Sequence, residues 1–336
     1  MLVLKIGALG DVLRTTPILR ALTASEDPVH VTWVVGEGAR SLLAGHPRID
    51  RLLVPGFETS ERLGAEHFDL VLSLDKDPYP TALATRIPAT ERRGFGRDPH
   101  GSLVPLHASA RYAYDLGLSD QTKFFENERT YQDMIFEVAG LDWRHQEYDV
   151  PAVADHLESG RAGLRAALGD GPGPVVGFNT GAGDVFANKA WTEDGYVDLA
   201  HRLHREGCRV ALLGGPGERD LNRAIALRSQ GSAVDTGCDH SLPEFAGLVA
   251  ACDLVVTGDT LGMHLAIAAA VPTVVLFGST CAPEIELYGR GEKIVTPISC
   301  HPCYRRECDI SPSCQDLITP QSVHDAVKRG LASVRP

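Results

Sequence analysis

The sequence predicts two doubly wound, Rossmann-like α/β domains, and three features support this. First, 336 residues are enough for two domains of roughly 100–200 residues each. Second, short apolar runs alternate with longer amphipathic stretches, which is typical of parallel strands joined by helices. Third, this pattern stops in a segment rich in glycine and proline near the middle of the chain and then begins again.

The first half, residues 1–155, is expected to form one of these domains. Its apolar runs predict strands at Leu2–Ile6, Val29–Val35 and Asp69–Leu74. Its amphipathic stretches predict helices at Asp11–Thr23, Ala39–His46 and Phe124–Ala139. Because ligands of open α/β sheets bind beyond the carboxyl ends of the strands, we expect the functional residues in the loops that follow them.

The segment Leu141–Gly173, which is followed by Pro174, is expected to be the crossing between the two domains. The second domain is expected at residues 172–318, and a C-terminal helix is expected within 319–336. The strands expected in the second domain are Val175–Asn179, Arg209–Leu213, Ala233–Asp235, Asp253–Val256 and Thr273–Phe277. The helices expected there and at the C-terminus are Thr192–Arg205, Glu218–Gln230, Leu242–Ala251, Met263–Ala270 and Pro320–Leu331. Two such domains facing a central cleft would suit transfer between two substrates, one held by each domain.

Composition and charge argue against several classes of function. Residues 1–150 carry 16 Lys+Arg against 22 Asp+Glu, and residues 151–336 carry the same numbers, so each half has a net charge of −6. Such a chain has no bulk attraction for nucleic acid or anionic lipid. No apolar run of about 18 residues is present, so no transmembrane segment is expected. The start of the chain lacks the features of a secretory signal, which predicts a cytoplasmic protein.

The turn after the first expected strand contains Gly7, Gly10 and Asp11. The glycines permit a tight backbone and close approach of a ligand. A carboxylate at Asp11 could take a proton from an acceptor hydroxyl. The plainer interpretation is that Asp11 caps a helix. The turn lacks the G-x-G-x-x-G pattern, so a nicotinamide oxidoreductase is disfavoured.

Three loops at strand ends in the second half contain groups suited to a nucleotide. Residues 179–183 and 188–191 offer small residues, the Thr180 hydroxyl and the Lys189 charge to a phosphate. Residues 214–218 place Gly215 where a nucleotide approaches and Glu218 where ribose hydroxyls could donate. Residues 257–264 place polar groups at a helix start, where a phosphate would dock. The plainer interpretations are a flexible glycine loop with a solvated lysine, an acid at a helix start and a structural histidine at 264.

Together these loops resemble glycosyltransferase family 9, the heptosyltransferases of lipopolysaccharide core assembly. Residues 10–17, Gly-Asp-Val-Leu-Arg-Thr-Thr-Pro, are similar to the G-D-(V/I)-x-x-(T/S)-x-P start of the family. Residues 259–266, Asp-Thr-Leu-Gly-Met-His-Leu-Ala, are similar to its D-(T/S)-G-x-x-H-L-A motif, with Leu261 where the family usually has glycine. Residues 277–280, Phe-Gly-Ser-Thr, match the F-G-x-T that follows.

The resemblance implies a GT-B fold and a metal-independent, inverting transfer of a sugar. The expected sugar is heptose, and the expected donor is ADP-heptose. By this resemblance Asp11 is the general base, and Lys189 stabilises the leaving diphosphate, which Thr180 also binds. Glu218 would hold the donor ribose. The other residues implied to line the donor site are Gly215, Asp259, Thr260, Gly262, Met263 and His264. No cofactor is required for catalysis on this interpretation.

The acceptor is expected on the first domain. The candidate residues are Gly10, Arg14, Arg93, Arg97, Lys123, Asn127 and Tyr131. Arginines and aromatic residues can hold a phosphorylated or acidic sugar, although a solvated basic turn and an amphipathic helix would give the same pattern. The acceptor could be a saccharide or a lipid-linked saccharide, and the negative charge of this half keeps a soluble acceptor open.

Four cysteines, Cys300, Cys303, Cys308 and Cys314, crowd into one short loop. In a cytoplasmic protein this spacing predicts a structural metal site, with zinc favoured over an iron–sulfur cluster. Packed thiols, or disulfides formed on oxidation, are the plainer alternatives. Two other functions remain open: a nucleotide-sugar epimerase, which would share the donor site without needing a saccharide acceptor, and an RNA-associated protein that uses the cysteine loop, which the acidic charge disfavours.

Overall fold

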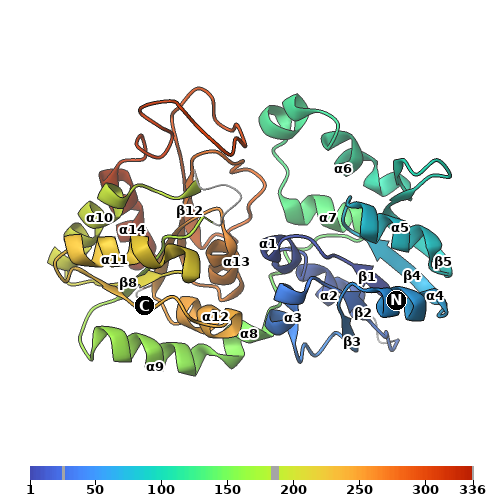
Figure 1. Cartoon of the computed structure of the whole chain (residues 1–336), viewed down its shortest axis with the longest axis horizontal. Coiled ribbons are helices and arrows are strands. Elements are labelled where there is room, and N and C mark those ends of the chain that lie inside the picture. The colour runs from blue at the N-terminus through green and yellow to red at the C-terminus, as the bar shows by residue number, and fades with distance from the viewer. Residues whose placement is uncertain (25–26, 183–188, 335–336) are drawn as a thin grey trace. The chain divides into compact units, whose positions relative to one another are not determined.

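The computed structural model describes residues 1–24, 27–182 and 189–334 and divides the chain into two compact units (Figure 1). Unit 1 comprises Met1–Pro151 together with the short segment Pro283–Glu286. Unit 2 comprises Ala152–Ala282 and Leu287–Pro336. Each unit is an α/β domain built on a parallel sheet, which confirms the fold class predicted from the sequence. Among the helices described, none has the length and apolar character needed to cross a membrane.

Unit 1 contains a six-stranded sheet in the order β3-β2-β1-β4-β5-β6. The strands are β1 (Leu2–Leu4), β2 (Thr32–Val34), β3 (Arg51–Leu53), β4 (Phe68–Ser73), β5 (Ala89–Arg97) and β6 (Leu103–Pro105). Neighbouring strands are parallel except β5 and β6, which are antiparallel. Because the order reverses beside β1, the turn that follows this strand lies at the topological switch point of the sheet.

The first five helices of unit 1 connect its strands, and the last two follow its final strand. The helices are α1 (Leu9–Leu13), α2 (Pro17–Leu22), α3 (Glu37–Leu43), α4 (Phe57–Gly64), α5 (Pro78–Arg86), α6 (Arg111–Leu116) and α7 (Tyr131–Ala139), with a 3-10 turn at Ala108–Ala110 and a π-helical turn at Thr122–Glu126. The single helix predicted over 11–23 is wrong. The chain turns between α1 and α2, where the Thr16 hydroxyl donates to the Leu13 carbonyl (2.7 Å) and Pro17 begins the next helix.

The helix predicted over 124–139 is also interrupted. Asn127 is buried, and its side-chain oxygen accepts hydrogen bonds from the Tyr112 hydroxyl (2.7 Å) and the Arg129 amide (3.3 Å). This local bonding competes with the helical ladder. A new helix, α7, therefore begins after Thr130, whose side chain accepts from the Asp133 amide.

Unit 2 contains a six-stranded, all-parallel sheet in the order β12-β11-β10-β7-β8-β9. The strands are β7 (Val175–Asn179), β8 (Arg209–Leu213), β9 (Ala233–Asp235), β10 (Leu254–Gly258), β11 (Thr273–Phe277) and β12 (Gly291–Val295). The order reverses between β10 and β7, so the loops after these two strands meet at the switch point. The four central strands are almost continuously buried, as expected for a sheet covered on both faces.

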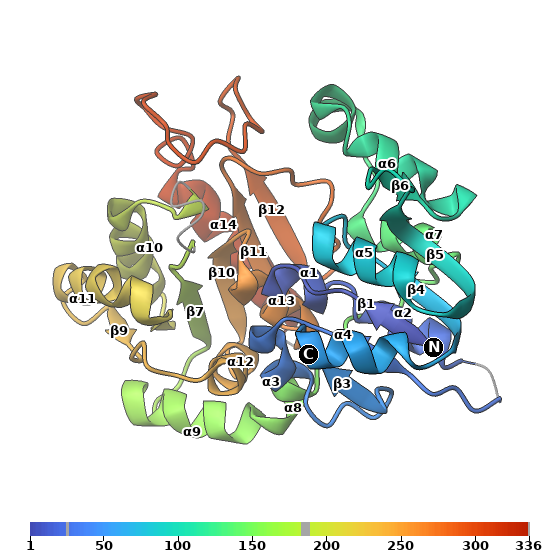
Figure 2. The same cartoon turned by 45° about the vertical axis from the view of Figure 1, so that its right-hand side comes forward.

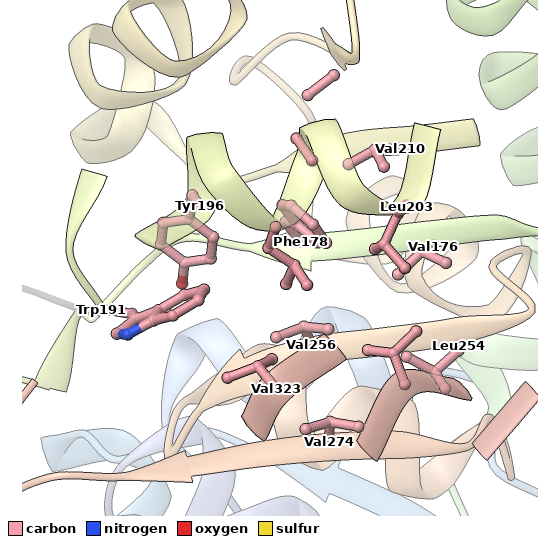
Figure 3. Packing of buried hydrophobic residues seen from close by; sticks show 14 of the residues in the cluster. Val176, Phe178, Trp191, Tyr196, Leu203, Val210, Leu254, Val256, Val274 and Val323 are labelled. Carbon is pink, nitrogen blue, oxygen red and sulfur yellow. The ribbon is translucent and has the colours of Figure 1, made fainter. Parts of the chain in front are cut away.

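Helices cover the sheet of unit 2, and one aromatic cluster fixes its core. The helices are α8 (Pro151–Asp155, beginning at the unit boundary), α9 (Leu157–Leu168), α10 (Glu193–Arg205), α11 (Arg219–Arg228), α12 (Leu242–Ala250), α13 (Leu261–Ala268) and α14 (Pro320–Val334), with a 3-10 turn at Pro216–Glu218. Figure 3 shows Phe178, Trp191 and Tyr196 packed against valines of the central strands. Trp191 and Tyr196 meet edge to face with ring centroids 5.1 Å apart. The indole N–H of Trp191 donates to the Ile318 carbonyl (3.0 Å), which ties this cluster to the start of the C-terminal helix region.

Candidate active site

A buried ion pair holds the turn that follows β1 in unit 1. The Lys5 ammonium lies 2.5 Å from the Asp75 carboxylate, and both side chains are almost fully buried. The second carboxylate oxygen of Asp75 accepts from the Ile6 amide (2.5 Å) and the Gly7 amide (3.1 Å). Burial alone would lower the pKa of Lys5, but Tyr131 and the carboxylate of Asp75 outweigh it and raise that pKa above its usual range. Asp75 therefore fixes the path of the chain into α1.

Asp11 lies on α1, and its carboxylate is the half-exposed member of a second network. Arg14 lies 2.7 Å from the Asp11 carboxylate, which is 37% exposed, whereas the Arg14 side chain is only 16% exposed. The Thr15 hydroxyl donates to the Asp11 carbonyl (2.7 Å) and shares a hydrogen bond with the Tyr131 hydroxyl (2.8 Å). The carboxylate is thus held against a cation and remains in part accessible to solvent.

Arg14 is itself positioned by Tyr131 and by the segment that returns from the second half of the sequence. Its guanidinium lies over the Tyr131 ring, 3.7 Å from the centroid, and 3.8 Å from the Glu284 carboxylate. The Tyr131 amide donates to the Glu284 carbonyl (2.9 Å). Burial alone would lower the pKa of Arg14. The neighbouring Asp11, Tyr131 and Glu284 raise this pKa by more than burial lowers it, so the side chain stays charged.

Three of the acceptor candidates lie at the Asp11 network, whereas the two arginines on β5 bind other parts of unit 1. Gly10, Arg14 and Tyr131 lie in or against the Asp11 network. Arg93 donates to the carbonyls of residues 139 and 140 and pairs with Glu91 (2.6 Å). Arg97 donates to the Thr81 hydroxyl (2.9 Å) and the Gly101 carbonyl (2.8 Å).

Of the two remaining acceptor candidates, Asn127 is buried within the fold and Lys123 lies near another lysine. Asn127 is buried and holds the chain between two helical segments, as described above. Lys123 lies near the half-buried Lys76, which follows Asp75 directly in the sequence. Burial lowers the pKa of Lys76, and the charge of Lys123 lowers it further. Two ammonium groups therefore gather near the carboxyl end of β4.

In unit 2, Asn179 is the last residue of β7 and joins this strand to the end of β10 and to the loop that follows β10. Its side-chain NH₂ donates to the hydroxyls of Thr257 (2.9 Å) and Thr260 (2.8 Å). Gly262, at the start of α13, packs directly against this amide, because a Cβ at Gly262 would lie 2.5 Å from the Asn179 Cγ. Glycine is thus needed at this position to let the helix approach the strand end.

Lys189 lies against the loop that follows β10. Its ammonium is 3.1 Å from the Asp259 carboxylate and 3.2 Å from the Asp259 carbonyl oxygen. A Cβ at Gly258 would lie 2.9 Å from the Lys189 carbonyl oxygen, so the two segments are in close contact. Gly183 and Asn188, which belong to the same predicted loop, lie outside the described residues. The two loops predicted to bind a phosphate are therefore brought together, with one cation between them.

Thr180, Gly215 and Glu218 connect the loops after β7 and β8. The Thr180 hydroxyl is buried and donates to the side-chain oxygen of Asn222 (2.6 Å), so in this structure it is engaged within the fold. The Glu218 carboxylate accepts from the Gly215 amide (2.8 Å) and lies against Gly181, where a Cβ would be 2.9 Å from the Glu218 Cδ. Glu218 thus sits between two glycine turns at the same edge of the sheet.

Met263 and His264 lie on α13 and are both buried. Their neighbours Asp259 and Thr260, in the loop before the helix, are partly exposed. The candidate donor site accordingly consists of partly accessible polar groups from the loops after β7, β8 and β10, with Met263 and His264 beneath the surface.

The match to a family model covers residues 57–313, which is most of the chain, and its description is glycosyltransferase family 9 (heptosyltransferase). The chain belongs to glycosyltransferase family 9. Among curated relatives, lipopolysaccharide heptosyltransferase 1 of Pseudomonas aeruginosa is 27% identical over 336 residues, covering 94% of this chain and 89% of the relative. The family resemblance predicted from the sequence motifs is thereby confirmed.

Two solved structures of this family show the same fold. The family 9 glycosyltransferase of Veillonella parvula superposes with a TM-score of 0.74 at 20% identity, covering 99% of this chain and 97% of that one. The heptosyltransferase WaaC of Escherichia coli with ADP-2-deoxy-2-fluoro heptose gives a TM-score of 0.67 at 18% identity, covering 98% of both chains. The predicted GT-B architecture is confirmed by these similarities.

Sequence reasoning about this glycosyltransferase missed the residues that hold its loops. Lys5 gave a usable signal, because a charged residue in a strand expected to be buried needs a partner. Asp75, directly after the run Asp69–Leu74, was the natural candidate for that partner. Asn179 had a similar signal at the end of a buried strand, whereas nothing in the sequence linked Glu284 to Arg14.

The cysteine loop was predicted to hold a metal. Cys314 is buried and Cys308 is exposed. Burial raises the pKa of the Cys314 thiol, and the nearby Cys303, Cys308 and Cys300 raise it further, so the four groups lie in one neighbourhood. Over the described residues, no group of three or more histidine, cysteine, aspartate or glutamate side chains is arranged to hold a metal ion.

Proposed function

We propose that this glycosyltransferase moves heptose from ADP-heptose to a hydroxyl of a saccharide acceptor in the assembly of a lipopolysaccharide core, with inversion at the anomeric carbon and without a catalytic metal. Membership of family 9 supports the reaction class. The name of the Pseudomonas relative supports the lipopolysaccharide acceptor, free or lipid-linked. The fluoro-heptose nucleotide in the E. coli structure supports the donor.

The observation that carries the proposal is the position of Lys189 at the carboxyl edge of the unit 2 sheet. Its ammonium is held between the loops after β7 and β10 by Asp259 (3.1 Å). When the bond to the sugar breaks, the departing diphosphate gains negative charge, and a prepositioned cation stabilises that charge more in the transition state than in the ground state. Lys189 can supply this charge in place of a metal ion.

Asp11 is the proposed general base. Its carboxylate lies 2.7 Å from Arg14 and is 37% exposed, so it is accessible in part, as a base that receives a proton from a substrate requires. Inversion needs the acceptor hydroxyl to attack from the face opposite the leaving group. We assign the other donor contacts to Thr180, Gly215, Glu218, Asp259, Thr260, Gly262, Met263 and His264, and the acceptor contacts to Gly10, Arg14, Arg93, Arg97, Lys123, Asn127 and Tyr131.

The proposal is tested by incubating the protein with ADP-heptose, with and without core oligosaccharide released from lipopolysaccharide by mild acid. We expect ADP release that depends on the acceptor, and a new glycoside whose one-bond C1–H1 coupling shows inversion. Asp11→Ala is expected to abolish transfer while ADP binding stays close to that of the wild type. Conversion of the donor to another nucleotide sugar without acceptor would instead identify an epimerase.

The donor base is tested independently of turnover. ADP, UDP and GDP are compared by thermal stabilisation, where a ligand at 100 times its Kd adds about 2.7 kcal/mol to the free energy of unfolding. We expect ADP to stabilise the protein well ahead of the other two. Equal stabilisation by all three would contradict the assignment of the adenine nucleotide.

We also propose that the cysteine loop takes up a structural metal ion, with zinc favoured, bound by Cys300, Cys303, Cys308 and Cys314. The described side chains do not form a ready-made site, so metal binding would require the loop to rearrange. The clustering of four thiols around the buried Cys314 supports this proposal. Elemental analysis of protein purified without chelators tests it. Less than about a tenth of an equivalent of zinc or iron would exclude the site.

A further inference from the structure

A groove on unit 1 lies between α4 and α5, and none of the residues assigned above to the active site lines it. It encloses about 590 Å³, which is within the range of small-molecule sites. The two helices lie side by side in both views of the chain (Figure 1, Figure 2). Phe57 begins α4 and Tyr79 lies in the first turn of α5, and both line the groove.

One end of the groove, at Phe57 and Tyr79, lies at the carboxyl edge of the sheet, where the Asp11 turn also lies. α4 follows β3 and α5 follows β4, so both helices begin at the carboxyl ends of parallel strands. The turn that leads to Asp11 follows β1 in the same sheet. Ligands of such sheets bind along this edge, and a molecule longer than one sugar could reach from the Asp11 turn toward the groove.

Two aromatic rings give the groove its apolar walls. Phe57 is 81% exposed and Tyr79 is 37% exposed, although both are large hydrophobic side chains. Single exposed apolar residues are common, but two that line one cavity provide a surface for a ligand. The faces of aromatic rings pack well against the C–H groups of a pyranose ring, because those groups carry partial positive charge.

Polar groups converge beside the rings. The Tyr79 hydroxyl shares a hydrogen bond with the Ser60 hydroxyl (2.9 Å) and accepts from the Gly56 amide (3.3 Å). These bonds fix its orientation at the wall of the groove. Glu61 and Arg86 also line the groove, and neither forms an ion pair with any other residue that the structure describes. A carboxylate and a guanidinium of this kind can accept from and donate to sugar hydroxyls.

We infer that this groove is a second saccharide subsite, which binds a pyranose ring of the acceptor other than the ring that receives the transferred sugar. Aromatic faces next to hydroxyl, carboxylate and guanidinium groups suit a ring that has both C–H and O–H surfaces. An acyl chain would satisfy only the aromatic walls and would bury Glu61 beside hydrocarbon at a cost. The inference rests on the proposed function for the identity of the acceptor, but it concerns binding and not transfer.

The test is direct binding in the absence of any donor. Core oligosaccharide released by mild acid is titrated into the full-length protein and followed by saturation-transfer NMR. Phe57→Ala is expected to weaken binding about tenfold, which corresponds to about 1.4 kcal/mol. Glu61→Gln is expected to weaken it about threefold, since a hydrogen bond to a charged acceptor is replaced by one to a neutral acceptor. Both side chains are exposed, so neither change should impair folding.

Leu227→Ala is the matched control, because Leu227 is 78% exposed on α11 of unit 2 and lines no part of the groove. Binding unchanged by Phe57→Ala, or weakened equally by Leu227→Ala, would overturn the inference. Binding of decanoate that depends on Phe57, without binding of the oligosaccharide, would show that the groove takes an acyl chain and would also overturn it. If the oligosaccharide binds through Phe57 but no transfer from ADP-heptose is observed, the proposed function fails and the subsite stands.

Discussion

Replacing Asp75 by asparagine is expected to destabilise unit 1 and to impair transfer for separable reasons. The substitution keeps the size of the side chain but removes the charge that neutralises Lys5, which is 2.5 Å away and buried. Breaking a buried pair by removing one partner costs about 3–5 kcal/mol, because the other charge remains uncompensated. At about 2–4 °C per kcal/mol for domains of this size, the melting transition of unit 1 should fall by about 6–20 °C.

The same substitution disturbs the turn that carries Asp11. Asp75 accepts from the Ile6 amide (2.5 Å) and the Gly7 amide (3.1 Å), and an asparagine cannot satisfy these two amides and Lys5 together. A displacement of a catalytic group by about 1 Å can lower turnover about 100-fold. We therefore expect kcat for transfer to fall by about this factor, while ADP binding, which we assign to unit 2, stays unchanged.

A double variant, Lys5→Met with Asp75→Leu, separates the two effects. An apolar pair of similar volume often replaces a buried ion pair without loss of stability, so most of the lost stability should return. Transfer should remain slow, because leucine offers no acceptor to the amides of Ile6 and Gly7. Scanning calorimetry at pH 7–8 and a steady-state ADP-release assay measure the two quantities.

The choice of pH follows from the direction of the Lys5 shift. The pKa of Lys5 in the folded protein lies above its ordinary value of about 10.4, so the ion pair contributes its full stability below that pH and loses it only as the pH rises further. A melting temperature for Asp75→Asn within about 2 °C of the wild type would refute the assignment of the pair. Wild-type turnover in the double variant would refute the role of the two amides.

Three further substitutions test other parts of the structure. Lys189→Met should lower kcat about 10²–10³-fold in the ADP-release assay, since it removes the charge assigned to the leaving diphosphate; a loss below about fivefold would argue against that role. Burial lowers the pKa of His46 beneath its ordinary value of about 6.5, so stability measured by urea unfolding should fall as the pH drops below that value, and His46→Gln should flatten this dependence. Gly262→Ala should lower the free energy of unfolding by about 1–3 kcal/mol in the same assay, because the new methyl group would meet Asn179 at 2.5 Å. Gly64→Ala is the control and should not destabilise the protein, because the space at its Cβ is open.

The sequence was most informative where strands are buried on both faces. β7, β8 and β11 have the bounds expected from their apolar runs. β3, β5, β6 and β12 were missed because each contains several partly or fully exposed residues, so none has the continuous apolar run that predicts a strand. The short edge strand β9 was nevertheless predicted with its observed bounds. Hydrophobic pattern reports burial, and strands that are half-exposed give it only weakly.

The candidate site was predictable in its loops but not in its contacts. The motifs around Asp11, Lys189 and Asp259 stood out because glycines and polar residues follow buried strands. That Asp259 pairs with Lys189, or that Asn179 joins Thr257 to Thr260, depends on the strand order, which a single sequence does not specify. Pairings of this kind arise from tertiary structure and have no local signature in the chain.

The membership of Pro283–Glu286 in unit 1 has a consequence for how the protein can be divided. A fragment cut after Pro151 would keep Tyr131 and Arg14 but lose the carbonyl and the carboxylate that Glu284 presents to them. A hybrid that joins the first half of this chain to the second half of a relative would keep the Arg14 guanidinium but would take whatever residue the relative has in place of Glu284. A fragment designed to contain all of unit 1 therefore needs the four residues Pro283–Glu286 from the later part of the chain along with the amino-terminal half.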